Sequence, residues 1–312
     1  MSDVKTIADS LIANISRVIY GKDAELRLLL TAYLSGGHIL LEDYPGLGKT
    51  TVARALAASV AGSYKRIQFT PDLLPSDITG INFFNSAEGR FTFRPGPIFA
   101  NIVIADEINR ATPRTQSALL ECMAEGQVTV DTETHPLDDP YLIIATENPV
   151  ESQGVYPLPE AQRDRFMIKL SLGYPSFSAE RKMLDRTPTE SVASLKPVCT
   201  CEDIVSARRA AETVTVSDNI KDYIVKISEE SRKHPKLTLG ISPRGSLALM
   251  TASRTFAAIS GRDFVLPDDV KALAVPVLAH RIIPSSRNNI LVSSTAAEIV
   301  GAILDTVPAP VD

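Results

Sequence analysis

The sequence contains no tryptophan and few of the residues on which disulfide-linked or metal-centred folds depend. Its three cysteines are too few and too irregularly placed for a disulfide framework. Cys199 and Cys201 form a Cys-x-Cys pair, but no second Cys or His pair lies nearby, so a zinc site is not indicated. Cys122 falls within the apolar pattern of a predicted helix, which indicates a core residue.

Long apolar runs and an excess of positive charge are also missing. No segment approaches the ~18 apolar residues of a membrane span, and the N-terminal residues lack the apolar part of a signal peptide, so we expect a cytoplasmic protein without membrane partners. The net charge of −5 gives no general attraction to nucleic acid. With 312 residues, 44% hydrophobic and 22% charged, the chain has a globular composition and room for two domains.

Residues 38–51 combine an apolar run, a glycine-rich turn and the start of a helical pattern. A triphosphate requires successive backbone N–H groups around its β-phosphate and a helix N-terminus directed at it. Gly46 and Gly48 allow the backbone to approach. Lys49 can bridge the β- and γ-phosphates, and the Thr50 hydroxyl can bind Mg²⁺. The predicted nucleotide-binding residues in this loop are Asp43, Tyr44, Pro45, Gly46, Leu47, Gly48, Lys49, Thr50 and Thr51.

The loop departs from the pattern G-x-x-x-x-G-K-[ST] at its first position, where Asp43 replaces glycine. Aspartate is among the few residues that tolerate a left-handed backbone, so the turn can persist. Its carboxylate would be unfavourable near phosphates unless it points away. A glycine-rich turn without a ligand is the alternative interpretation of this stretch taken alone.

Residues 101–107 form an apolar run that ends in two acids, Asp106 and Glu107. This is the pattern of a buried parallel strand whose carboxyl end projects charge into a crevice. With a phosphate loop upstream, we expect Asp106 to hold Mg²⁺ and Glu107 to polarise the water that attacks the γ-phosphate. The alternative is that the two acids only cap the start of a helix. That interpretation would leave the phosphate loop upstream unexplained.

A second buried-strand pattern, residues 141–147, is followed by Asn148, whose amide can hydrogen-bond the attacking water or the γ-phosphate without adding negative charge. A further apolar strand is predicted at 167–172, and Arg163 and Arg165 lie just before it. Both are either solvated surface arginines or, in an assembly, contacts to a phosphate.

Two hairpins are predicted between these strands. Residues 81–97 carry aromatic arms around a turn, and we expect this hairpin to fold onto its own domain. Residues 127–139 form the second hairpin, which contains four acids and no Lys or Arg. It is therefore a poor match for a phosphate backbone.

The composition changes at residues 173–176, which we interpret as a hinge into a helical second domain. Ser242 as N-cap and Pro243 as first helical residue place Arg244 on the first turn of one of its helices. There the side chain can reach across a cleft.

The ordered set of Pro-Gly-Leu-Gly-Lys-Thr, Ile-Ala-Asp-Glu-Ile-Asn-Arg-Ala, Ala-Thr-Glu-Asn-Pro and Leu-Pro-Glu-Ala-Gln-Arg-Asp-Arg-Phe resembles the MoxR family of AAA+ ATPases. The resemblance covers nearly the whole chain, and the two inserted hairpins are typical of the family. It implies an α/β AAA+ P-loop domain with a central parallel sheet over residues 1–174. A small all-helical lid domain would follow over residues 175–312.

The resemblance also implies roles for individual residues. Asn148 corresponds to sensor 1, and Arg165 to the arginine finger donated to a neighbour's nucleotide, with Arg163 as the second candidate. Arg244 corresponds to sensor 2, which couples the phosphate to lid closure. Gln68 is a polar residue near the end of a predicted strand, and the resemblance assigns it no role.

The expected function is ATP hydrolysis with Mg²⁺ in a homo-oligomeric ring, six subunits by family resemblance, that remodels or activates a protein client. The resemblance implies a partner with a von Willebrand factor A domain and its client enzyme. Two alternatives are a nucleic-acid motor, which the acidic hairpin and the net charge disfavour, and a nucleotide-gated scaffold, which Glu107 and Asn148 disfavour.

Overall fold

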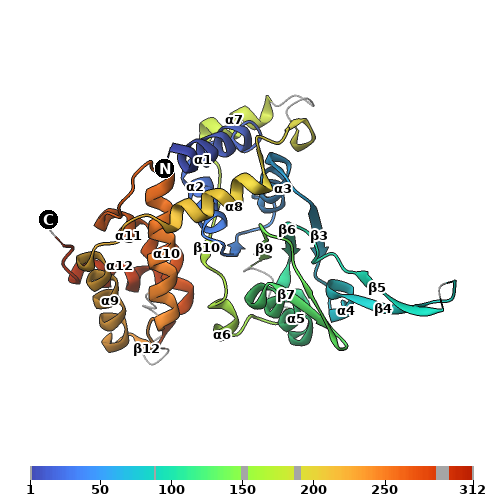
Figure 1. The fold of residues 1–312 in the computed structure, drawn as a ribbon. Coiled ribbons are helices and arrows are strands. Elements are labelled where there is room, and N and C mark those ends of the chain that lie inside the picture. The colour runs from blue at the N-terminus through green and yellow to red at the C-terminus, as the bar shows by residue number, and fades with distance from the viewer. Residues whose placement is uncertain (1, 88, 149–153, 186–190, 286–294, 311–312) are drawn as a thin grey trace.

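The computed structural model describes the chain except for residues 1, 88, 149–153, 186–190, 286–294 and 311–312. A parallel sheet with helices on both faces forms one part of the molecule. Helices gather at one end of it, and two hairpins lie at the other (Figure 1). The predicted fold class is confirmed.

The central sheet has five parallel strands in the order β10-β1-β9-β6-β3. Their bounds are β1 Ile39–Glu42, β3 Tyr64–Gln68, β6 Ile102–Asp106, β9 Leu142–Glu147 and β10 Ile168–Leu170. The three central strands are almost wholly buried, as their apolar runs predict. Glu42 pairs with Glu147, and Gln68 pairs with Asp106. The carboxyl ends of these strands therefore meet at one edge, where polar side chains from distant parts of the sequence come together.

Alternating strand residues face two hydrophobic cores, one on each side of the sheet. Ile39 and Leu41 belong to one core, and Leu40 belongs to the other. The first core includes α1 (Ser2–Ile15), α2 (Asp23–Leu34) and α3 (Lys49–Ser59). The second includes α4 (Pro75–Thr79), the 3₁₀ turn Ile108–Arg110 and α5 (Pro113–Glu125), in which Cys122 is buried as expected.

Both predicted hairpins are present. The first consists of β4 (Gly80–Asn85) and β5 (Arg90–Pro95), and the second of β7 (Gln127–Val130) and β8 (Glu133–Pro136). The base of the first hairpin packs on the second, since the Phe93 ring stacks on His135 with centroids 4.0 Å apart.

The expectation that the first hairpin folds onto its own domain is wrong for its outer half. This half stands away from the body of the molecule (Figure 1), and Phe84 and Phe91 are 56% and 71% exposed. The two rings pack edge to face on each other, with centroids 5.5 Å apart, instead of entering the core.

The C-terminal part is mainly helical. Its helices are α7 Phe177–Leu184, α8 Cys201–Glu212, α9 Asp218–Lys233, α10 Pro243–Ile259, α11 Pro267–Leu278 and α12 Ala296–Thr306. It departs from an all-helical lid in one short antiparallel pair, β12 (Leu237–Leu239) with β13 (Ile283–Pro284). β11 (Cys199–Thr200) also pairs with β2 (Val60–Ala61) of the first part.

One hydrophobic core runs across the predicted division after residue 174. Val4, Leu11 and Leu56 belong to the same buried cluster as Ile204 and Leu249 of the helical part. The division into residues 1–174 and 175–312 stays a prediction, since the packing is continuous between the two parts.

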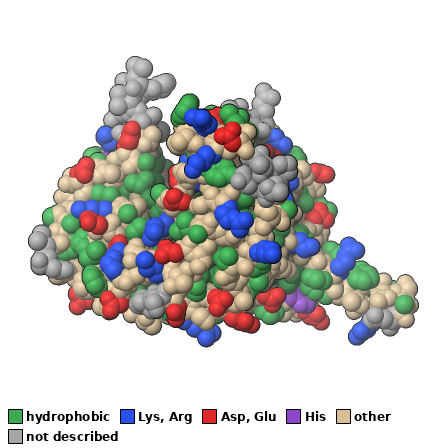
Figure 2. Space-filling model, turned by 90° about the horizontal axis from the view of Figure 1, so that it is seen from above, with side chains coloured by type: hydrophobic (Ala, Val, Ile, Leu, Met, Phe, Trp, Pro, Cys, Tyr) green, Lys and Arg blue, Asp and Glu red, His purple; other side chains and the backbone are tan. Residues whose placement is uncertain are grey.

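The surface carries both signs of charge. Figure 2 shows Lys and Arg interspersed with Asp and Glu over one face, without a broad basic area on that face. Among the described residues, no helix combines the length and the apolar character that a membrane span requires.

Candidate nucleotide-binding site

The loop between β1 and α3 has the backbone that its glycines predict. Gly46 and Gly48 adopt left-handed conformations, with φ of 83° and 86°. Gly48 is the N-cap of α3 and supplies no side-chain cap, so the first N–H groups of that helix are left to a ligand or solvent. This is the backbone arrangement that binds a phosphate.

Lys49, the first residue of α3, reaches back over the sheet edge. Its Nζ donates to the main-chain oxygens of Asp43, at 2.5 Å, and Glu147, at 2.8 Å. Partial burial lowers the pKa of the ammonium group from its usual value. The group is therefore held between the ends of β1 and β9, at the mouth of the loop.

The Asp43 carboxylate points away from the phosphate loop. It accepts hydrogen bonds from the Ser171 hydroxyl at 2.7 Å, the Leu172 N–H at 2.5 Å and the Gly173 N–H at 3.2 Å, and Asp43 is only 5% exposed. This arrangement ties the end of β1 to the chain that leaves β10. The departure from the glycine pattern is thus a structural anchor, with its charge turned from the ligand.

Asp106 gathers hydroxyl and guanidinium donors at the end of β6. Thr50 Oγ1 lies 3.3 Å from its Oδ2, and Thr146 Oγ1 donates to its Oδ1 at 2.6 Å. Arg66 donates to Oδ2 through Nε at 3.0 Å and Nη2 at 2.6 Å. The predicted metal-binding pair, Thr50 and Asp106, is therefore in contact.

The donor set fits Mg²⁺ rather than a metal held by protein alone. Mg²⁺ commonly takes one or two carboxylates and completes its shell with substrate phosphates and water. Within the described ranges, no group of three or more His, Cys, Asp and Glu residues is arranged to hold a metal. The adjacent hydroxyl and carboxylate at the phosphate loop match the first arrangement.

Glu107 follows directly and has a left-handed backbone, with φ of 58° and ψ of 50°. Such a conformation is uncommon for a residue other than glycine, and it often marks a functional position. Its Oε2 accepts from Gln68 Nε2 at 2.9 Å and pairs with Arg110 Nε at 3.2 Å. Its N–H donates to Thr146 Oγ1. The carboxylate is thus oriented by two side chains beside Asp106.

Asn148, at the end of β9, is buried with 4% exposure. It lines a cavity of about 280 Å³ together with Glu42, Glu147 and Arg163. Burial, followed by the charge of Glu42, raises the pKa of Glu147 to about 6. The sheet edge therefore holds a polar cavity next to the phosphate loop.

The two candidate finger arginines occupy different surroundings. Arg163, the last residue of α6 (Glu160–Arg163), lines the same cavity as Asn148 of its own chain. Arg165 lies in the turn before β10, is half-buried, and donates from Nη1 to the main-chain oxygen of Leu120 in α5.

Arg244 is exposed on the first turn of α10, where Ser242 Oγ accepts from the Gly245 N–H at 3.2 Å as predicted. Ser242 and Pro243 line a cavity of about 520 Å³ with Asp164. The structure thus brings the start of α10 to the segment that carries Arg165.

The sequence analysis missed three residues of this site: Arg66, Arg110 and Thr146. A signal for Arg66 was available, because Arg66 and Gln68 alternate along β3 and so share one face of the strand. The pairing of β3 with β6 was needed to show which acids Arg66 and Gln68 contact.

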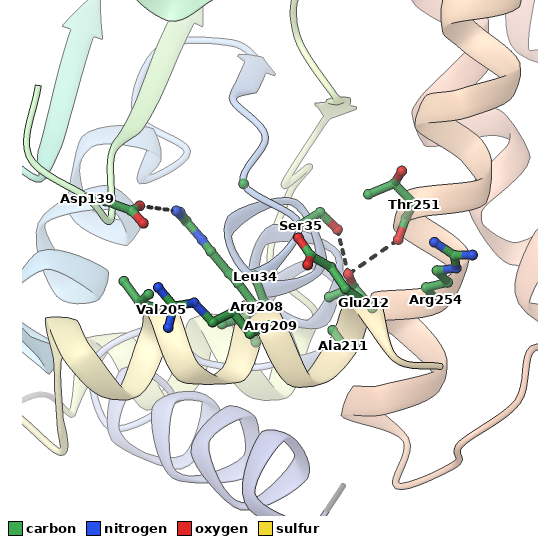
Figure 3. Close-up of a pocket in the computed structure, with 12 residues that line it drawn as sticks. Leu34, Ser35, Asp139, Val205, Arg208, Arg209, Ala211, Glu212, Thr251 and Arg254 are labelled. Carbon is green, nitrogen blue, oxygen red and sulfur yellow. Dashed lines mark hydrogen bonds and ion pairs between the residues drawn. The ribbon is translucent and has the colours of Figure 1, made fainter. Parts of the chain in front are cut away.

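A separate cavity of about 630 Å³ lies at the opposite, N-terminal edge of the sheet (Figure 3). Gly36 and Asp139, which precede β1 and β9, line it. Arg208 extends from α8 toward Asp139 and also donates to the main-chain oxygen of Tyr33 at 3.1 Å. None of the predicted nucleotide-binding residues lines this cavity.

Comparison with known proteins places the chain. The family model described as "ATPase family associated with various cellular activities (AAA)" matches residues 38–168, and an AAA lid model matches 229–302. The protein named Chaperone MoxR1 from Mycobacterium tuberculosis is 39% identical over 99% of this chain and 84% of its own length. The chain belongs to the MoxR family of AAA+ ATPases. The predicted family is confirmed.

Two further proteins match this MoxR chain over nearly its full length. The protein YeaC of Bacillus subtilis, described as uncharacterized, is 48% identical over 96% of this chain and 95% of its own. A crystal structure of a presumed ATPase from Cytophaga hutchinsonii superposes with a TM-score of 0.91 at 36% identity, covering 98% of this chain and 96% of the other. ATPase chemistry and nucleotide binding follow from membership of the family.

Proposed function

We propose that this MoxR protein hydrolyses ATP with Mg²⁺ in a homo-oligomeric ring of six subunits and uses the energy to remodel a protein client. The observation that carries the proposal is the meeting of Lys49, Thr50, Asp106 and Glu107 at one edge of the sheet, next to an uncapped helix N-terminus. These are the groups that bind a triphosphate and activate water.

Each residue contributes a distinct step. The loop N–H groups and Lys49 hold the phosphates, and Thr50 with Asp106 holds the metal. Mg²⁺, when bound, supplies positive charge that offsets the charge of the phosphates. Glu107, oriented by Gln68 and Arg110, accepts a proton from the attacking water. The Asn148 amide orients that water without adding negative charge.

A neighbouring subunit completes the reaction centre. We assign the trans-acting finger to Arg165, which stabilises charge in the transition state. Arg163 lines the cavity beside Asn148 of its own subunit, whereas Arg165 does not. This difference supports Arg165 as the residue that acts on a neighbour. Arg244, exposed on the first turn of α10, acts as sensor 2.

Glu107→Gln tests the hydrolytic role. The amide keeps the size of the side chain but accepts a proton poorly, so ATP binding should persist while turnover falls about 10²- to 10⁴-fold. Nucleotide binding by fluorescence and steady-state phosphate release measure the two effects. Undiminished phosphate release by the variant would remove Glu107 from the mechanism, whereas release near zero by the native protein would favour a nucleotide-gated scaffold.

The shared site has its own test. Turnover per subunit should rise with protein concentration through the range in which the ring assembles, because one copy lacks a neighbour's finger. Mass photometry at the same concentrations would measure the assembly. A rate independent of dilution across that range would contradict the shared site.

We propose a protein client, presented by a partner with a von Willebrand factor A domain. A relative named Chaperone MoxR1 supports the client class. The second hairpin adds support, since Asp131 and Glu133 make it unsuited to a phosphate backbone. A pull-down with Glu107→Gln held in its ATP-bound form would identify the client. Stimulation of the ATPase by nucleic acid at physiological salt would favour the motor alternative.

A further inference from the structure

The backbone next to Arg165 is bound by two residues of the lid, His280 and Arg281. Both lie in the 3₁₀ turn Ala279–Arg281 that follows α11 directly, about 115 residues later in the sequence. Arg281 is only 7% exposed and His280 only 4%. We propose that Arg281, with His280, positions the arginine finger, so that movement of the lid sets whether Arg165 reaches the neighbouring nucleotide.

Arg281 contacts the residues on either side of Arg165. Its Nη1 donates to the main-chain oxygen of Asp164 at 2.7 Å and also pairs with the Asp164 carboxylate. Its Nη2 donates to the main-chain oxygen of Phe166 at 2.7 Å. Because the guanidinium group is planar and rigid, these contacts fix the spacing and direction of the two carbonyls that flank the finger.

His280 adds a second bond to the same carbonyl. Its Nε2 lies 3.0 Å from the Phe166 oxygen and must donate, because a carbonyl only accepts. Burial lowers the pKa of His280 to about 3, so the ring is neutral at physiological pH and keeps this donor. The Phe166 carbonyl is therefore bound by two lid residues.

The finger segment, residues 164–166, has little regular structure of its own. α6 is a helix of four residues that ends at Arg163, and β10 begins only at Ile168. The N–H groups of Arg165 and Phe166 bond to the preceding turn, whereas the carbonyls of Asp164 and Phe166 are directed to the lid. The Arg165 side chain is held by the Leu120 carbonyl of α5, and Phe166 packs in the second core. The carbonyls on either side of Arg165 are fixed by the lid.

On its other side, Arg281 is anchored within the lid. Its Nε donates to the main-chain oxygen of Val277 in α11 at 2.8 Å. A side-chain carbon added at Gly245, next to Arg244, would lie 3.4 Å from Arg281 Cδ. The Arg281 side chain therefore lies beside the first turn of α10 and also binds residues 164 and 166, so a lid that moves with nucleotide would move both together.

This inference rests on the proposed shared site, and mixed rings separate the two. Subunits with Lys49→Ala cannot hold ATP but retain a finger, whereas subunits with Arg165→Ala hold ATP but lack one. Mixing the two inactive proteins should restore ATPase activity. Failure to restore activity, with mixed assembly shown by mass spectrometry, would overturn the shared site and with it the role given to Arg281.

With activity restored, Arg281→Gln is placed on one kind of subunit at a time. In the finger-donating Lys49→Ala subunit it should lower the restored kcat by about 10- to 100-fold, the effect of a displaced group of about 1 Å, with the KM for ATP unchanged. In the ATP-holding Arg165→Ala subunit, where Arg281 acts only through its place beside α10, the loss should be clearly smaller. A structural role alone would give equal losses in both positions, and that result would overturn the proposal.

Two further variants guard against misfolding. Arg262→Gln is the matched control, since Arg262 pairs with buried Asp269 inside the lid and does not touch the finger segment. It should lower the melting temperature without any difference between the two positions. If Arg281→Gln does not fold, Asp164→Asn takes its place, because it removes the ion pair but leaves the carbonyl contacts. It should lower the restored kcat by less than Arg281→Gln does, and again more in the finger-donating subunit than in the ATP-holding one. An equal loss in both kinds of subunit would count against Arg281.

Discussion

The two ends of the central sheet differ in what their buried polar groups bind. At the carboxyl end, the two acids at the end of β6 bind other side chains: Asp106 contacts Thr50 and Arg66, and Glu107 contacts Gln68. At the amino end, the buried His38 ring binds main-chain groups. His38 accepts the Ile143 N–H at Nδ1 and donates from Nε2 to Met123 O.

This difference separates chemistry from stability. Side chains that bind one another can exchange partners when a ligand arrives, whereas a side chain that satisfies buried main-chain groups cannot leave without exposing an unpaired donor or acceptor. We therefore expect substitutions that affect the contacts of Asp106 and Glu107 to change turnover with little effect on folding, and those at His38 to do the reverse. Four experiments test this contrast, from the largest expected effect to the smallest.

Arg165→Ala should lower kcat by about 10³- to 10⁵-fold, because a trans-acting finger stabilises charge only in the transition state. ATP binding by the same subunit should be unchanged. Steady-state phosphate release and nucleotide titration measure the two quantities. Arg163→Ala is the matched control, and a larger loss in this variant would transfer the finger role to Arg163.

The stability of the amino end should depend on pH through His38. Burial lowers its pKa from 6.5 to about 4, so between these values the unfolded chain binds a proton that the folded chain does not. Stability is fully present above pH 6.5 and falls as the pH drops toward 4, by roughly 3 kcal/mol. Urea unfolding across this range measures the slope.

Two other groups that are wholly or partly buried also affect how the unfolding free energy depends on pH. His280, with its pKa lowered to about 3, contributes in the same direction. Glu147, with its pKa raised to about 6, contributes with the opposite sign, since its stabilisation is lost as the pH rises through 6. His38→Gln keeps a hydrogen-bonding group that does not titrate, so the slope should flatten. An unchanged slope in this variant would exclude His38 as its cause.

Asp43→Gly should separate stability from nucleotide binding at the carboxyl end itself. The substitution restores the glycine of the phosphate-loop pattern but leaves the Ser171, Leu172 and Gly173 donors without their carboxylate. We expect a loss of about 1–3 kcal/mol in unfolding free energy and retained ATP affinity. Asp43→Asn, which keeps an acceptor, should lose less. A large drop in ATP affinity with unchanged stability would contradict this assignment.

Gln68→Leu should have the smallest effect. It removes one of the two groups that orient Glu107, while Arg110 remains, so we expect kcat to fall by about tenfold with unchanged KM and melting temperature. Single-turnover hydrolysis measures the chemical step directly. An equal rate in the variant would mean that Arg110 alone orients Glu107.

Contiguous features of the site were predictable because their signals are local. The phosphate loop from Asp43 to Thr51 and the acids at the end of β6 both follow from motif spacing and from the apolar runs that precede them. The two hairpins follow from their turn residues. Each depends on a few neighbours in the chain, which a single sequence displays.

Contacts between distant segments were not predictable in this way. Arg66 meets Asp106 across 40 residues, Asp43 meets Leu172 across 129, and Arg281 meets Asp164 across 117. The order of the parallel strands decides which side chains share an edge, and the docking of the lid decides which carbonyls face Arg281. The sequence alone determined the family, the phosphate loop and the acids beside it. Tertiary structure decided how those groups are oriented, because orientation comes from packing between elements that local propensity does not encode.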